Sequence, residues 1–145
     1  MKKVFCMAFA AVMLVLASCG SKNSSEEAAA SGPSYDGAKA KELAEKYQNS
    51  DPSEMSEEDA NAIADLVVVL YNDQAAVMPE WTKADMDKQQ QIEDEFDKAH
   101  PNNKDITSLY NWYGSEKASE EKQKAVEDAK TKMYEARQKA MEEQQ

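Results

Sequence analysis

The 145-residue chain carries 28 acidic and 17 basic side chains, which gives a formal net charge of −11. A surface of this sign repels nucleic acid and anionic lipid headgroups, so it argues against both as binding partners. The length is enough for one small domain, and two cysteines and one histidine leave little thiol or imidazole chemistry.

The first 18 residues have the pattern of an export signal. Lys2 and Lys3 precede an uncharged apolar run over residues 4–16, and this order is typical of a secretory signal peptide. The run is shorter than the roughly 20 apolar residues that a membrane-spanning helix needs. We therefore expect residues 1–18 to be removed and no transmembrane anchor to be retained.

The end of this signal, Leu16-Ala17-Ser18-Cys19, resembles the lipobox of bacterial lipoproteins. The resemblance implies that Cys19 becomes the first mature residue and carries a diacylglyceryl group on its sulfur, usually with a further acyl chain on its amino group. One acyl chain binds a bilayer only marginally, but two or three on one residue hold the protein stably. The expected location is therefore the cell envelope, with the outer membrane favoured. The alternative is an ordinary secretory signal that is cut after Ala17 or Ser18.

Residues 19–34 are predicted to form a lipidated cysteine followed by a flexible tether. The stretch is small and polar, so it cannot bury enough apolar surface to offset the entropy of ordering. Lys22 and the acids at 26 and 27 resemble a surface-export signal of some bacterial lipoproteins, although Asn23 to Ser25 interrupt it. Both the periplasmic and the surface-facing orientation therefore stay open. Because Cys6 leaves with the signal, we expect neither a disulfide nor a cysteine metal site.

Residues 35–145 are predicted to form one all-α domain. Pro52, Pro79, Pro101 and Gly114 interrupt the pattern and divide it into five segments with helical periodicity. The first covers about 36–48, and Ser56 before three acids predicts the start of the second. The apolar run at 66–71 could be a buried strand, but no other segment offers a pairing partner, so a central helix is favoured.

The later segments complete the expected bundle. The third is expected to start near Thr82 and stop at His100, the fourth to end at Gly114, and the fifth to run from Ser115 almost to the end of the chain. The last helix has a seam of small residues and one methionine: Ala118, Ala125, Ala129, Met133, Ala136 and Ala140. We expect a small antiparallel bundle of three longer helices and one or two short ones, with antiparallel neighbours joined at Pro79 and at Gly114.

No catalytic constellation is evident. His100 is the single histidine, and a helix stop that interacts with the helix dipole explains it without a catalytic role. The glycine count excludes a phosphate-binding loop. The acids at 93–97 encircle a helix instead of converging, so a solvated face is favoured over weak divalent-cation binding. We expect no enzyme activity, no cofactor and no metal site.

The aromatic residues are the best candidates for a contact surface. Tyr110, Trp112 and Tyr113 lie in one short segment, and Trp81 lies near the junction of the second and third segments. Tryptophan and tyrosine are enriched in binding hot spots, but aromatics beside a turn also commonly close a small core. Both interpretations stay open.

These observations favour a membrane-anchored envelope lipoprotein whose non-catalytic, acidic helical domain acts by contact with a protein partner. The first alternative is a structural envelope protein that self-associates through the alanine seam. The less favoured alternatives are an enzyme and a carrier of a small apolar ligand, with a pocket lined by Tyr71, Phe96 and Tyr110.

Overall fold

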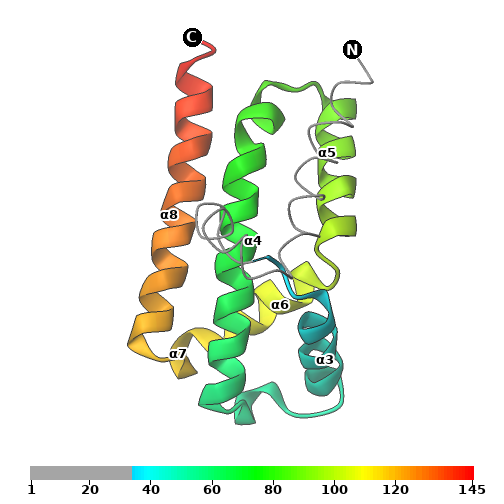
Figure 1. Cartoon of the computed structure of the whole chain (residues 1–145), viewed down its shortest axis with the longest axis vertical. Helices are drawn as coiled ribbons and strands as arrows, with labels where there is room; N and C mark the ends of the chain where they lie inside the picture. Colours follow the sequence, from blue (N-terminus) through cyan, green and yellow to red (C-terminus); the bar gives the residue numbers. More distant parts are fainter. Residues whose placement is uncertain (1–33) are drawn as a thin grey trace, which may run out of the picture. The chain divides into compact units, whose positions relative to one another are not determined.

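The computed structural model describes residues 34–145 (Figure 1), of which Tyr35–Gln145 form one compact unit. All regular elements of this part are helical, which confirms the predicted all-α bundle. The signal peptide, Cys19 and nearly all of the tether lie outside the described residues, so the interpretation of these segments stays a prediction. No helix in residues 34–145 combines the length and hydropathy that a membrane span requires.

The first helices begin where local capping signals place them. In α3 (Gly37–Gln48) the Asp36 carboxylate accepts the Lys39 amide at 3.0 Å. A short 3-10 turn, η2 (Pro52–Glu54), then leads to α4 (Glu57–Lys83), where the Ser56 hydroxyl accepts the Asp59 amide at 3.2 Å. Each cap satisfies a backbone donor that the helix cannot pair itself. The apolar run at 66–71 lies within α4, as expected for a central helix.

Pro79 does not separate two helices, so the predicted boundary there was wrong. It lies inside α4, which continues to Lys83. Pro79 is exposed and lies near the helix end, where the lost hydrogen bond affects only the last turns. The next helix, α5 (Met86–Ala99), starts after Asp85, whose carboxylate accepts the Lys88 amide at 2.9 Å, and not near Thr82.

Gly114 does not end a helix either. The segments α6 (Asn103–Leu109), η3 (Tyr110–Gly114) and α7 (Ser115–Lys117) follow one another without interruption. Gly114 has an ordinary helical φ of −70°, so nothing at this residue breaks the chain direction. The break comes at Ala118 and Ser119, which are extended, and α8 (Glu120–Glu142) starts there instead of at Ser115.

The two longest helices, α4 and α8, run parallel (Figure 1). Lys122 near the start of α8 pairs with Asp65 near the start of α4, and Glu143 after α8 pairs with Lys83 at the end of α4, both at 2.7 Å. The antiparallel arrangement expected for the segments joined near Pro79 holds for α4 and α5, whereas α4 and α8, which do not follow each other in the chain, are parallel. The reason is that α5 runs back alongside α4, and α6, η3 and α7 then carry the chain across to the start of α8 at the end where α4 begins.

The core lies mainly between α3, α4, α6 and the first half of α8. Its largest fully buried side chains are Leu43, Ile63, Val67 and Ile106. On α8 the buried residues include Ala129, Met133 and Ala140 of the predicted seam, together with Val126. Small side chains allow α8 to lie close along α4, so packing continues well beyond the aromatic segment.

Candidate functional site

The most unusual backbone feature is the π-helical turn η3. Its five residues end with a hydrogen bond from the Ser115 amide to the Tyr110 carbonyl, five positions back. Such turns insert an extra residue into a helix and occur frequently at functional sites. Here Tyr110 and Gly114 are buried under the turn, while Asn111, Trp112 and Tyr113 between them are exposed.

The four predicted contact residues do not form one surface. Trp112 is 79% exposed and Tyr113 is 36% exposed, whereas Tyr110 is only 7% exposed and belongs to the core. Trp81 lies at the end of α4, where it is half-buried and its Nε1 donates to the Glu93 carboxylate at 3.0 Å. The structure therefore places Trp112 and Tyr113 together on the surface, and gives Tyr110 and Trp81 packing contacts.

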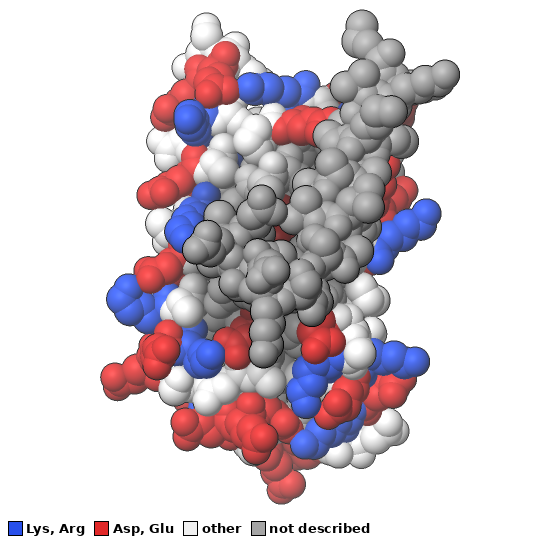
Figure 2. Space-filling view, viewed as in Figure 1, with Lys and Arg blue, Asp and Glu red and all other residues white. Residues whose placement is uncertain are grey.

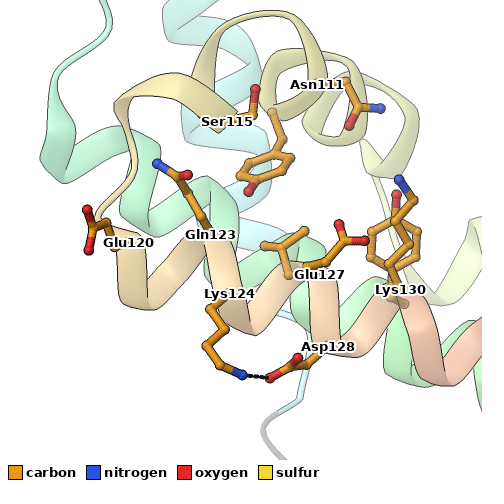
Figure 3. A pocket seen from close by; sticks show the side chains of 11 residues that line it. Asn111, Ser115, Glu120, Gln123, Lys124, Glu127, Asp128 and Lys130 are labelled. Carbon is orange, nitrogen blue, oxygen red and sulfur yellow. Dashed lines mark hydrogen bonds and ion pairs between the residues drawn. The ribbon is translucent and has the colours of Figure 1, made fainter.

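A groove of about 700 Å³ opens beside the turn, between α4, η3, α7 and α8 (Figure 3). Figure 3 shows Asn111 and Ser115 projecting from the segment above the groove, and Glu127 and Lys130 rising from α8 below it. Tyr71 of α4 and Tyr110 of η3 also line the groove. We call this the tyrosine groove.

The charges around the tyrosine groove perturb both phenols. Burial raises the pKa of Tyr71; nearby Lys130 opposes this shift, while Tyr134 and Glu127 add to it. Burial also raises the pKa of Tyr110, and Glu127 and Tyr71 add to this shift. Both phenols are thus neutral at ordinary pH and can donate as well as accept a hydrogen bond.

A second groove, of about 480 Å³, lies between α4, α5 and α6 and has a more apolar floor. Its lining includes Val77, Met78 and Trp81 of α4 together with Ile92 and Phe96 of α5. The expected pocket uniting Tyr71, Phe96 and Tyr110 is therefore not formed. Those three side chains share the core region, but Phe96 faces one groove while the two tyrosines face the other.

His100 has a structural role that the sequence only partly suggested. It ends α5, as expected, but it is 6% exposed and both ring nitrogens are engaged. Nε2 lies 2.7 Å from Oδ2 of Asp73 in α4, and Nδ1 lies 2.8 Å from the Phe96 carbonyl. The ring also stacks on Phe96 at 4.0 Å and meets the edge of Tyr35 at 5.1 Å. These contacts join α4, α5 and the start of the folded unit.

Within residues 34–145, no cluster of histidine, cysteine and acidic side chains is arranged to hold a metal ion. No protein family, curated protein or solved structure shows significant similarity to the chain. The functional argument therefore depends on the residues and their geometry.

Proposed function

We propose that this chain is a membrane-anchored bacterial envelope lipoprotein whose acidic helical domain acts without catalysis, by binding a protein partner. The anchoring part depends on the lipobox resemblance at 16–19 and on acylation of Cys19. The binding part depends on one observation, the exposure of Trp112 on a π-helical turn.

An exposed tryptophan is informative because covering its large apolar surface on binding gives a large favourable free energy. Trp112 and its neighbour Tyr113 are the two residue types most enriched, with arginine, in binding hot spots. Other aromatic residues of the described part are mostly buried or half-buried, including Tyr47, Phe96 and Tyr110. Trp112 is thus presented outward in a domain that otherwise covers most of its aromatic surface.

The turn that carries Trp112 is held firmly from below. Tyr110 packs in the core, and a Cβ added to Gly114 would lie 3.4 Å from the Tyr110 ring. Just after the turn, the Lys117 ammonium donates to the Ser53 carbonyl and, at 3.1 Å, to the Met55 carbonyl. A contact residue on a rigid support loses less conformational entropy on binding.

The surrounding charge favours a partner with a basic surface. Residues 34–145 carry 26 acidic and 14 basic side chains. On the face drawn in Figure 2 both signs occur along the edges, while acidic side chains gather at the lower end, where η2 and the first turn of α4 lie. Complementary charge speeds encounter and disfavours acidic competitors.

The alternative of self-association through the alanine seam has less support. α8 already packs along α4 inside the domain, and Ala129 and Ala140 are buried there. A seam that is used within one molecule is not available for a second copy.

Cross-linking on whole cells tests the contact. The full-length chain and its Trp112→Ala variant are cross-linked in cells and recovered, and the attached proteins are identified. We expect a discrete partner that is reduced at least tenfold by Trp112→Ala, since a hot-spot residue contributes 2 kcal/mol or more. Met86→Ala is the matched control, because Met86 is 84% exposed on α5. Equal recovery with all three chains would overturn the proposal.

Anchoring is tested separately by fractionating cells that produce the Cys19→Ser variant. We expect the variant to leave the membrane fraction, because it lacks the residue that is acylated. A variant that stays with membranes would contradict the lipid anchor without affecting the partner test.

A further inference from the structure

We propose that the tyrosine groove binds a neutral saccharide. This site is separate from the Trp112 contact and goes beyond the function proposed above. Its volume of about 700 Å³ falls in the range typical of small-molecule sites.

The first argument is that the polar groups around the groove lack partners within the described residues. No side-chain hydrogen bond or ion pair there engages the following seven groups: the hydroxyls of Tyr71, Tyr110 and Ser115, the Asn111 amide, the carboxylates of Glu120 and Glu127 and the Lys130 ammonium. Neighbouring side chains differ. Lys124 and Asp128 pair with each other at 2.8 Å, pointing away from the turn in Figure 3, and Gln123 donates to the Ala118 carbonyl at 2.7 Å.

The second argument concerns the chemistry of these groups. Three hydroxyls and one amide can each donate and accept, the two carboxylates only accept and the ammonium only donates. A sugar presents adjacent hydroxyls, which also donate and accept, so it can satisfy all of these groups together. An apolar ligand would instead cover polar groups without replacing their hydrogen bonds to water, which carries a large penalty.

The third argument concerns charge. The three unpaired charges that line the groove, Glu120, Glu127 and Lys130, sum to −1. The excess of acidic over basic side chains in residues 34–145 repels anionic ligands such as sugar phosphates. A neutral ligand is not repelled, and its hydroxyls can donate charge-assisted hydrogen bonds to the Glu120 and Glu127 carboxylates and accept one from the Lys130 ammonium.

The fourth argument is that the walls are preorganised. Tyr110 has its ring fixed in the core, at 7% exposure. Asn111 and Ser115 line the groove from the segment above it (Figure 3).

The test measures binding of defined probes to the full-length chain in detergent by isothermal titration calorimetry. The neutral probes are cellobiose, maltose and N,N′-diacetylchitobiose, the anionic probe is glucose 6-phosphate and the zwitterionic probe is glycine. We expect saturable one-to-one binding of at least one neutral disaccharide and none of glucose 6-phosphate or glycine. Absence of binding by all three disaccharides would overturn the proposal, and so would tighter binding of either charged probe.

Variants locate the site. Tyr71→Phe and Glu127→Gln keep the shape of the side chain but remove a hydroxyl or a charge, so each is expected to weaken disaccharide binding about tenfold. Glu135→Gln is the matched control, because Glu135 is exposed on the same helix and does not line the groove. Thermal unfolding of each variant establishes that it folds. If the folded Tyr71→Phe and Glu127→Gln variants bind the disaccharide as tightly as the unchanged chain, the assignment of the site to this groove is wrong.

The variant Trp112→Ala separates the two proposals. It is expected to lose its protein partner and keep disaccharide binding, because Trp112 does not line the groove.

Discussion

Replacing His100 with alanine is expected to lower the free energy of unfolding by about 3 kcal/mol. The stacked contact with Phe96 accounts for about 1 kcal/mol, and the two ring hydrogen bonds for about 1 kcal/mol each. No large further penalty is expected for stranded acceptors. The Asp73 side chain is 41% exposed and can regain water, and the Phe96 carbonyl keeps the backbone amide of residue 100 at 2.9 Å.

The assay is urea unfolding of the full-length chain carrying Cys19→Ser, followed by circular dichroism. Tryptophan fluorescence in a Trp112→Phe background provides a local signal from Trp81, because its Nε1 is bonded to Glu93 of α5. The variant Asp73→Asn keeps an oxygen that can accept from Nε2, so it is expected to cost less than about 1 kcal/mol. A loss below about 1 kcal/mol for His100→Ala, or equal losses for the two variants, would refute the assigned role of the buried ring.

Three further predictions concern pH and capping. Burial opposes the charged form of Asp59, but hydrogen bonds from Lys46 at 2.6 Å and Tyr47 at 2.5 Å outweigh it and hold the pKa of Asp59 below 3.8. The ionised Asp59 carboxylate therefore stabilises the fold above pH 3.8, and this stabilisation is lost as the pH falls through the lowered pKa of the folded state. Asp59→Asn should make the free energy of unfolding depend less on pH in the acidic range of a stability–pH curve. Burial and the bond to Asp59 raise the pKa of Tyr47 to about 12, so this tyrosine stabilises fully below pH 10 and loses its effect up to about pH 12. Tyr47→Phe should remove this loss of stability at alkaline pH, as measured by thermal unfolding over the same pH series. Asp85→Ala should cost about 1 kcal/mol of stability in urea by removing the cap of α5. Asp87→Ala, two residues later and exposed, should cost clearly less, because Asp87 is not the cap.

Features that depend on neighbours in the sequence could be predicted. The Ser56 cap and the start near Asp36 involve residues three positions apart, so the sequence contains both partners. The run at 66–71 was assigned to a helix because no other strand was available, and it lies in α4.

Features that depend on residues far away in the sequence could not be predicted. Pro79 is tolerated because it is exposed near a helix end, which its own sequence context does not show. The bond between His100 and Asp73 joins residues 27 positions apart, and no local motif indicates it. The parallel direction of α4 and α8 likewise follows from where α6 and α7 lead the chain.

In the candidate site, too, local spacing could be predicted from the sequence, whereas the exposure of each side chain could not. Spacing in an ordinary helix would place Tyr110 and Tyr113 on one face. The π-helical turn spreads this segment over more residues, so Gly114 is buried beside Tyr110 and Tyr113 is displaced toward solvent. In an ordinary helix Trp112 would lie off this face, but its exposure could be decided only by the fold.

The parallel pairing of α4 and α8 also determines when this protein can fold. Contacts such as Asn61 with Ser119 and Lys83 with Glu143 join residues 58 and 60 positions apart, and such long-range pairings form slowly. During synthesis, α4 emerges well before α8, and the side of α4 that packs on α8 stays uncovered until then. A chain that stops before Glu120 would keep every residue of α3 to α7 and still lack the helix that covers α4. The apolar side of α4 should therefore stay exposed to proteases and chaperones until the last 26 residues have been synthesised.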